Sequence, residues 1–310
     1  MNQQNSKYLM LIRPRSFSSN EETLASNDFQ NQFEETSSLS SIRAAVDLEF
    51  TNMISVLSDH KIDHVVFEDV EDIGSPDAIF PNNWVTFHHD GTVVLYPMMS
   101  PKRRKERRHD IIEILASNGF SVDKIIDISR LEDTEHYLEG TGSMILDRVN
   151  KKAYACISSR TTIEALVAFS NAMDYEIIEF RSTTDMPIYH TNVMMSLGMD
   201  TALVCFDVIK ERELSLKLRS DLVRSGRTVI DVSIEQMNQF LGNALEVRNK
   251  SDEKYLLMSE TAEKSLTYEQ KEMIKGRLNL LSFPIPTIEK YGGGSVRCML
   301  AEIFLEKKHQ

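Results

Sequence analysis

The sequence predicts an α/β fold of the five-bladed propeller type, a ring of small sheets with pseudo-five-fold symmetry. Four β-hairpins recur at near-constant spacing, and each is followed by a helical stretch and a short apolar strand. The two ends of the chain together supply a fifth copy of this unit. Because repeats with a period near 50 residues are typical of rings and arrays, we expect residues 1–310 to form one domain.

The hairpins are predicted from apolar alternation on both sides of turn residues. They span residues 83–98, 143–158, 192–209 and 243–259, with turns at HDG, VNKK, GMD and NKSD. Their starts lie 60, 49 and 51 residues apart. This regularity predicts that the hairpins occupy equivalent places around the ring.

Helices and closing strands complete each unit. The helical stretches are 100–119, 159–174, 210–226 and 259–276, and the apolar strands after them are 124–129, 176–180, 228–233 and 281–286. The fifth unit combines strand 298–304 with strand 8–14, helix 41–60 and strand 64–69. A ring whose last strand pairs with its first hides its sheet edges.

Residues 15–40 interrupt this pattern. The segment RSFSSNEETLASNDFQNQFEETSSLS is polar and has no apolar periodicity. Long loops in compact domains are often lids or disordered segments. We therefore expect a mobile surface loop here.

The composition is that of an ordinary globular protein, with 41% hydrophobic and 26% charged residues. The formal net charge of -12 argues against a nucleic-acid-binding surface, which needs a basic footprint. It favours a small-molecule partner. The basic run KRRKERR at 102–108 is the exception, and a run of this kind is usually the solvated start of a helix.

The cysteines and the apolar runs indicate the compartment. Cys156, Cys205 and Cys298 are widely spaced, which fits reduced thiols better than a zinc site or a disulfide framework. Residues 1–7 are polar, and no apolar run approaches the length of a membrane helix. We expect a soluble cytoplasmic protein without a membrane partner, and the sequence leaves a homo-oligomer open.

Unusual residues precede the hairpins, where the ring places them near its centre. The segments are DAIFPNN (77–83), YLEGTGS (137–143), YHTN (189–192) and GGGSVRC (292–298). Cys298 alone would usually be a small buried apolar residue. However, the three glycines before it permit close approach of a ligand to the backbone, and His190 could serve as the base that a thiolate nucleophile needs.

The other histidines have simpler interpretations. His60, His64, His88, His89 and His136 are expected to be surface or hydrogen-bonded core residues, and His88–His89–Asp90 has no third ligand at a metal-binding spacing. His190 differs because it opens an apolar strand. Glu139, flanked by glycines, is expected at the same centre, where an unpaired carboxylate would be costly.

Four motifs carry a resemblance to a known superfamily. GGGSVRCM, LEGTGS, HTNVMMSLG and DAIFPNNW resemble the motifs of the guanidino-group-modifying enzymes, which include arginine deiminase, dimethylarginine dimethylaminohydrolase, agmatine deiminase and the amidinotransferases. The resemblance runs from IRPRSF to the end of the chain and implies the five-bladed propeller called the pentein fold. It implies that Cys298 is the nucleophile, His190 the general acid and base, and Glu139 the carboxylate that holds a substrate nitrogen. FPNNW is most similar to the citrulline-utilisation hydrolases.

Two departures from this family concern the substrate. Arginine deiminase-like enzymes commonly carry aspartate at the positions of Asn83 and Asn192. A guanidinium only donates hydrogen bonds, whereas a ureido group also has a carbonyl that must accept them. The two asparagines therefore favour a ureido substrate, although Asp77 and Glu139 remain acidic.

The resemblance also indicates how the rest of the substrate is held. Arg103 and Arg160 match arginines that bind the substrate carboxylate in the dimethylarginine hydrolases, and arginine forks suit carboxylates. With Asp77, Asn83 and Asn192 they form the expected substrate-binding set. A free amino acid is therefore the expected partner.

The sequence thus predicts a cysteine hydrolase that converts citrulline into ornithine, carbon dioxide and ammonia. No metal or organic cofactor is expected, because cysteine and histidine supply the nucleophile and the proton transfer. The alternatives within the family are arginine deiminase, dimethylarginine dimethylaminohydrolase and amidinotransferase activity. An alternative of another class is a non-catalytic binding protein, since the same propeller occurs in a ribosome-associated anti-association factor.

Overall fold

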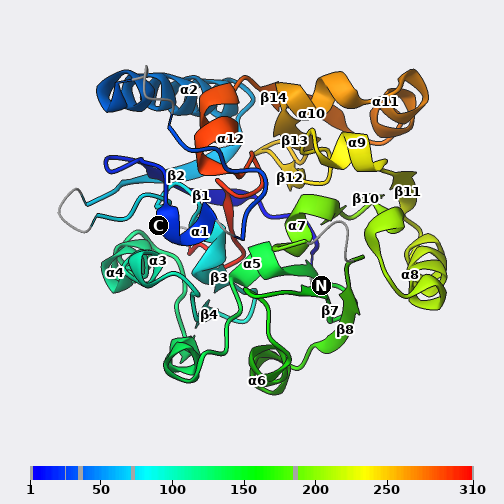
Figure 1. Ribbon diagram of the computed structural model, residues 1–310, viewed down its shortest axis with the longest axis horizontal. Helices are drawn as coiled ribbons and strands as arrows, with labels where there is room; N and C mark the ends of the chain where they lie inside the picture. The colour runs from blue at the N-terminus through cyan, green and yellow to red at the C-terminus, as the bar shows by residue number, and fades with distance from the viewer. Residues whose placement is uncertain (1–2, 25, 34–37, 71–73, 184–187, 309–310) are drawn as a thin grey trace.

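Five three-stranded sheets surround a common centre in the computed structural model of the protein (Figure 1). The structure describes residues 3–24, 26–33, 38–70, 74–183 and 188–308. In four of the sheets the two hairpin strands pair antiparallel, and the second hairpin strand pairs parallel with the strand after the helix. The predicted five-bladed α/β propeller is confirmed.

Four sheets are built from consecutive segments, as the hairpin spacing predicted. They consist of β3 (Val85–Phe87), β4 (Thr92–Leu95) and β5 (Lys124–Asp127); β6 (Met144–Asp147), β7 (Lys152–Ile157) and β8 (Glu176–Arg181); β9 (Met195–Leu197), β10 (Thr201–Val204) and β11 (Thr228–Asp231); and β12 (Leu245–Arg248), β13 (Lys254–Ser259) and β14 (Asn279–Phe283).

The fifth sheet joins the two ends of the chain. β1 (Tyr8–Arg13) pairs antiparallel with β15 (Ala301–Ile303) and parallel with β2 (Asp63–Glu68). This pairing confirms the predicted fifth unit. It also fixes the position of Cys298, which lies just before β15.

Helices cover the outer side of the ring (Figure 1). The longest is α2 (Leu39–Asp59), which buries Ile42, Val46, Phe50, Met53 and Leu57 at the spacing of one helix face. The other outer helices are α4 (His109–Ser117), α6 (Ile163–Met173), α8 (Arg212–Arg224), α10 (Glu260–Ser265) and α11 (Tyr268–Lys275). None of the helices within the described residues is long and apolar enough to cross a bilayer.

Two predicted helices are each divided into two. The stretch 100–119 forms α3 (Pro101–Arg104) and α4, and the stretch 259–276 forms α10 and α11. The second break has a local cause, because Thr267 caps α11 by a reciprocal capping box with Gln270. Short helices η3 (Ser129–Thr134), η4 (Phe206–Val208) and α9 (Ile234–Met237) lie in the connections.

Short helical turns precede the inner strands and converge near the ring centre. η2 (Pro81–Asn83) leads into β3, α5 (Gly140–Ser143) into β6 and α7 (Thr191–Met194) into β9, whereas α12 (Pro286–Gly292) approaches β15. The inner strands neighbour one another, β15 beside β3 and β9 between β6 and β12. Residues at these turns therefore come close together although they are far apart in sequence.

Residues 15–40 differ from the predicted surface loop where the structure describes them. The segment contains α1 (Glu21–Leu24), and residues 25 and 34–37 lie outside the described residues. Its buried side chains are Phe17, Asn20, Thr23, Asn27 and Gln30. Four of these five are polar, which explains why apolar periodicity did not reveal that the segment packs against the ring.

The first described residues tie the far ends of the inner strands together. Nε2 of Gln4 donates hydrogen bonds to the carbonyl oxygens of Leu146 at 2.7 Å and Leu197 at 3.2 Å, at the ends of β6 and β9. Oε1 of Gln4 accepts from the N–H of Arg148 at 2.8 Å. One side chain therefore holds two neighbouring blades at the end opposite the helical turns.

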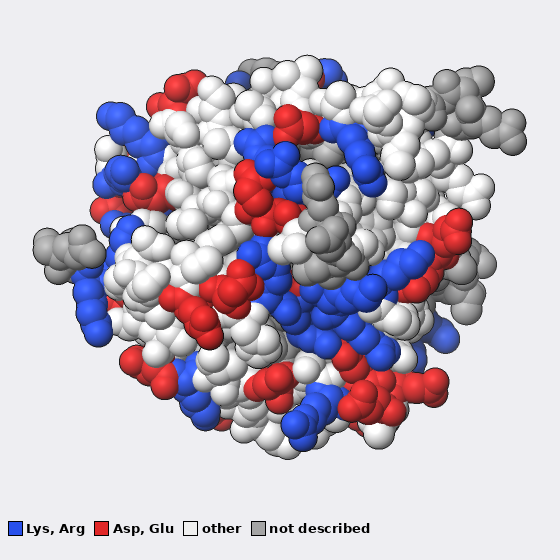
Figure 2. Space-filling view, turned by 90° about the vertical axis from the view of Figure 1, so that its left-hand side faces the viewer, with Lys and Arg blue, Asp and Glu red and all other residues white. Residues whose placement is uncertain are grey.

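The basic run 102–108 lies on the side of the molecule that carries α3 and α4. Figure 2 shows Lys and Arg side chains there interspersed with Asp and Glu. Arg107 pairs with Glu132 at 2.6 Å and Arg108 with Asp110 at 2.5 Å. Carboxylates thus neutralise part of the run, and Arg103 points inward and is buried.

Candidate active site

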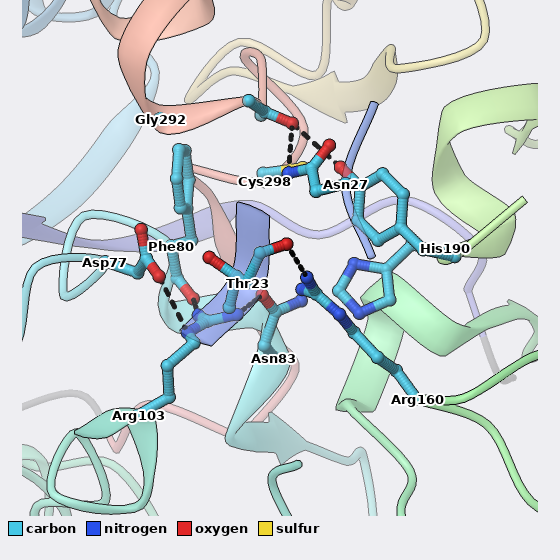
Figure 3. A pocket seen from close by; sticks show the side chains of 13 residues that line it. Thr23, Asn27, Asp77, Phe80, Asn83, Arg103, Arg160, His190, Gly292 and Cys298 are labelled. Carbon is cyan, nitrogen blue, oxygen red and sulfur yellow. Dashed lines mark hydrogen bonds and ion pairs between the residues drawn. The ribbon is translucent and has the colours of Figure 1, made fainter. Parts of the chain in front are cut away.

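A small pocket lies where the helical turns converge (Figure 3). It is lined by six of the predicted site residues together with groups from the N-terminal segment and the glycine run: Asp77, Asn83, Arg103, Arg160, His190 and Cys298, with Thr23, Asn27, Phe80, Tyr189 and Gly292 to Gly294. The two other predicted residues lie immediately behind the wall. Glu139 contacts His190, and Asn192 contacts Cys298.

Glu139 and His190 form a buried pair. Nε2 of His190 lies 2.8 Å from Oε2 of Glu139, while Oε1 of Glu139 accepts from the N–H of Met99 at 3.1 Å. Arg103 and Arg160 approach the same carboxylate at 3.5 and 3.7 Å. A buried carboxylate needs a partner, and for Glu139 this role is filled by the imidazole of His190 and the guanidinium groups of Arg103 and Arg160.

The environment determines the charge of this pair. Burial alone would raise the pKa of Glu139, but Arg160, the His190 hydrogen bond and Arg103 bring it well below its ordinary value. Burial lowers the pKa of His190 to about 4, although Glu139 opposes this. At neutral pH the carboxylate is ionised and the imidazole is neutral, so Nε2 carries the proton and Nδ1 has the lone pair.

Arg103 is saturated by protein acceptors. Its Nε and Nη2 donate to both oxygens of Glu106 at 3.0 and 2.9 Å, and its Nη1 donates to Oδ1 of Asn83 at 2.9 Å. Nη2 also reaches the carbonyl oxygen of Phe80 at 3.5 Å. This guanidinium therefore orients Asn83 and joins the acidic groups around it.

Glu106 is a site residue that the sequence reasoning missed. Its side chain is 1% exposed, and burial raises its pKa to about 7 despite the attraction of Arg103. The signal was present in the sequence, because Glu106 follows Arg103 by three residues and such pairs share a helix face. Interpretation of the run, apart from Arg103, as the solvated start of a helix concealed it.

Arg160 connects the pocket to the N-terminal segment. Its Nε and Nη2 lie 3.2 and 2.8 Å from Oγ of Ser26, and Nη2 donates to the carbonyl oxygen of Thr23 at 3.2 Å. The guanidinium also lies over the ring of Tyr189, 4.8 Å from its centroid. Thr23 and Asn27 thus form part of one wall of the pocket beside the predicted carboxylate ligand.

Asp77 presents an unsatisfied acceptor. Its Oδ2 accepts from Nδ2 of Asn20 at 2.7 Å and lies 3.6 Å from Nε of Arg103. Its Oδ1 has no hydrogen-bond partner among the described residues. Burial raises the pKa of Asp77, although Arg103 and Asn20 oppose the rise.

Cys298 is buried, and its sulfur receives two amide donors. Nδ2 of Asn192 lies 3.3 Å from Sγ, and Nδ2 of Asn243 lies 3.2 Å from it. Asn192, predicted to contact the substrate, thus lies behind the sulfur rather than in the pocket lining. Asn243 precedes β12 at the one hairpin start that the motif comparison left out, and the five-fold repeat was the signal that could have revealed it.

The glycines keep space open around these groups. A Cβ atom on Gly142 would lie 2.3 Å from Nδ2 of Asn83 and 2.8 Å from Nδ1 of His190. Gly294 lies against Phe80 and Cβ of Cys298, and Gly293 has a φ of 65°. Side chains at these three positions would clash with their neighbours, and the close approach of a ligand to the glycine backbone remains a prediction.

The remaining histidines that the structure describes show no gathering into a metal site. No group of three or more His, Cys, Asp or Glu side chains within the described ranges could hold a metal ion. His88 is buried and lies 2.8 Å from Oγ1 of Thr86. It is a hydrogen-bonded core histidine.

A model of the family described as N,N dimethylarginine dimethylhydrolase, eukaryotic, matches residues 13–305. The chain belongs to this family. The match confirms the predicted superfamily of guanidino-modifying enzymes. No curated protein shows significant sequence similarity to the chain.

Several solved structures share the fold of this family member. The N-terminal domain of ArgZ with a covalently bound reaction intermediate is 15% identical, with a TM-score of 0.73 over 96% of this chain and 99% of that one. A substrate-bound variant of the same domain, from an arginine dihydrolase of the ornithine–ammonia cycle in cyanobacteria, is 14% identical, with a TM-score of 0.72 and the same coverage. DDAH from Pseudomonas aeruginosa complexed with citrulline is 15% identical, with a TM-score of 0.67 over 96% of this chain and 100% of that one.

As a member of the dimethylarginine dimethylhydrolase family, the chain is a cysteine-dependent hydrolase that acts on C–N bonds of ureido or amidino compounds. The prediction of an enzyme is confirmed, and the non-catalytic alternative is set aside. The preference for citrulline and the similarity to the citrulline-utilisation hydrolases remain predictions.

Proposed function

We propose that this enzyme hydrolyses the ureido group of citrulline and releases ornithine, carbon dioxide and ammonia. The observation that supports this most directly is the orientation of Asn83. Its Oδ1 is engaged by Nη1 of Arg103 at 2.9 Å, and one N–H of its Nδ2 donates to the carbonyl oxygen of Glu139 at 3.5 Å, which leaves the second N–H of Nδ2 for a ligand. An N–H donor suits the carbonyl oxygen of a ureido group and not a guanidinium, which has only donors.

The proposed reaction begins with attack of the Cys298 thiolate on the ureido carbon. Nδ1 of His190 takes the proton of the Cys298 thiol and passes it to the ornithine nitrogen as the C–N bond to that nitrogen breaks, and a thiocarbamate remains on Cys298. Water activated by His190 then cleaves the C–S bond, and the resulting carbamate gives carbon dioxide and ammonia. Glu139 stabilises the imidazolium that forms between the two proton transfers.

The proposed orientation places the amino-acid end of citrulline between Arg160 and Asp77. Arg160 would exchange its contacts with Ser26 and Thr23 for the α-carboxylate, which a guanidinium can bind through two parallel hydrogen bonds. The unsatisfied Oδ1 of Asp77 would accept from the α-ammonium group. Arg103, already saturated, would act on the substrate through Asn83.

A guanidino substrate is the second candidate, because of the family match and the charge of the site. Three buried carboxylates, Asp77, Glu106 and Glu139, surround two guanidinium groups. An excess of negative charge favours a cationic ligand such as arginine or dimethylarginine. The alternative therefore has a physical basis that an assay must address.

The test supplies purified enzyme with citrulline, arginine and dimethylarginine in parallel and identifies the products by chromatography. Ornithine from citrulline supports the proposal. Citrulline accumulating from arginine or dimethylarginine, with no ornithine from citrulline, would establish the second candidate. Cys298→Ala should abolish turnover with an unchanged circular dichroism spectrum, and full activity of that variant would exclude the mechanism.

The cysteines also bear on the compartment. Cys156, Cys205 and Cys298 are all free thiols, and a thiolate nucleophile must stay reduced to act. We propose the cytoplasm as the compartment in which the enzyme works.

A further inference from the structure

Asn243 is a buried residue at the hairpin start before β12, and the family motifs in the sequence assign it no role. Its Nδ2 lies 3.2 Å from Sγ of Cys298 and 3.1 Å from the carbonyl oxygen of Asn192. Its Oδ1 accepts from the N–H of Arg297 at 3.0 Å. The side chain thus joins the nucleophile, the residue before it in the chain and a second hairpin start.

The two backbone contacts fix which way this amide points. If oxygen and nitrogen changed places, the oxygen would face the carbonyl of Asn192 and the NH₂ group would face the N–H of Arg297. Both pairings would be repulsive, so the orientation with Nδ2 toward Asn192 is the one the backbone accepts. The second N–H of Asn243 is then directed at the sulfur.

Asn192 lacks this restraint. It also donates to Sγ, at 3.3 Å, but its Oδ1 has no partner among the described residues. Nothing in its hydrogen bonding distinguishes one amide orientation from the other. Asn243 is therefore the donor whose direction the fold determines.

The charged and titratable groups near Cys298 are directed elsewhere by their own contacts. Tyr189 donates its hydroxyl to the carbonyl of Gly293 at 2.8 Å, and Arg297 binds the carbonyl of Leu300 at 2.8 Å and Glu302 at 3.1 Å. His190 binds Glu139, and Arg103 and Arg160 have the partners described above. Within the described residues, the hydrogen bonds to Sγ come from the two asparagines.

We propose that Asn243 is a positioning residue that holds the Cys298 sulfur as a hydrogen-bond acceptor and thereby favours the thiolate over the thiol. An ionised acceptor forms a stronger hydrogen bond than a neutral one, and the thiolate is the nucleophilic form. This inference rests on the proposed role of Cys298 as the nucleophile. By this proposal Asn243, at the fourth hairpin start, activates the sulfur of Cys298.

The test measures the pH dependence of Cys298 alkylation by iodoacetamide, with the modified residue identified by mass spectrometry. In Asn243→Ala the midpoint of the profile should rise by about one pH unit, which makes alkylation about tenfold slower at a fixed pH below the midpoint. Asn243→Asp keeps an acceptor for the N–H of Arg297 but places a carboxylate beside the sulfur. Its midpoint should rise further.

Asn249 provides the matched control. It is buried at the other end of β12, where its Nδ2 donates to the carbonyl of His60 at 3.1 Å and to Glu253. Asn249→Ala therefore removes a buried amide from the same hairpin without touching the sulfur, and its alkylation midpoint should equal that of the wild type.

Wild-type midpoints in folded Asn243→Ala and Asn243→Asp would overturn the proposal. If the alanine variant does not fold, the isosteric aspartate variant decides the question. Alkylation requires no substrate, so a wild-type enzyme that leaves citrulline intact would refute the proposed function without affecting this result.

Discussion

Replacement of Asn83 by aspartate tests the proposed substrate most sharply, because it exchanges the Nδ2 donor for a charged oxygen at nearly constant shape. The contact between Oδ1 and Nη1 of Arg103, at 2.9 Å, can persist because aspartate supplies the same oxygen. Nδ2 becomes an oxygen, which also ends its donation to the carbonyl oxygen of Glu139 at 3.5 Å. The variant thus converts a donor facing the pocket into an acceptor at constant shape.

The magnitude follows from the environment of that atom. For citrulline, an acceptor would face the ureido oxygen in a buried site, and an unsatisfied buried group costs about 1–3 kcal/mol. This corresponds to a roughly 5- to 150-fold fall in kcat/KM. For arginine the sign reverses, because a guanidinium gains a charged acceptor.

The assay compares kcat/KM for citrulline and arginine in the wild type, Asn83→Asp and Asn83→Ala. We expect the arginine-to-citrulline ratio to rise at least about tenfold in the aspartate variant. In the alanine variant citrulline turnover should fall with no gain for arginine. An aspartate variant that loses both activities equally, with an unchanged ratio, would contradict the assignment of Nδ2 as the ureido donor.

Two further perturbations probe the pocket and its charges. Gly142→Ala would place Cβ 2.3 Å from Nδ2 of Asn83 and 2.8 Å from Nδ1 of His190, and displacement of these groups should reduce kcat/KM about 100-fold without unfolding. Gly276→Ala, at a site with only ordinary contacts, is its control, and equal activities in the two variants would refute the steric argument. Glu106→Gln tests the buried carboxyl group. The pKa of Glu106 in the folded protein is about 7, above the reference value of 4.5. The wild-type carboxyl therefore adds to the free energy of unfolding below pH 4.5, and this contribution is lost as pH rises through about 7. Chemical denaturation at several pH values should show the difference in free energy of unfolding, Glu106→Gln minus wild type, rising by up to about 3 kcal/mol over that interval. A pH-independent difference would show that burial does not raise this pKa.

The sequence predicted the ring because its signal is periodic and repeated. Apolar alternation marked the four hairpins, and their spacing implied that 298–304 and 8–14 must pair, as β15 and β1 do. The same logic brought Glu139, His190 and Cys298 together, since equivalent positions in a ring face one centre. These predictions needed only pattern and symmetry.

The parts that escaped prediction are buried polar groups. Asn20, Thr23, Asn27 and Gln30 are buried, yet their composition is that of an exposed loop, because partners elsewhere satisfy them. Asn243 resembled an ordinary turn residue after a glycine. Hydrophobicity cannot distinguish a polar side chain in water from one that is hydrogen-bonded in the interior.

The hydrogen bonds of Gln4 have a practical consequence for anyone preparing this protein. β6 and β9 begin just after Glu139 and His190, and Gln4 joins their other ends through Leu146 and Leu197. Loss of this amide would remove these hydrogen bonds between two strands whose opposite ends follow the 2.8 Å contact between Glu139 and His190. Removal of the first four residues would take away three hydrogen bonds at the ends of β6 and β9, so kinetic work calls for protein that retains Gln4.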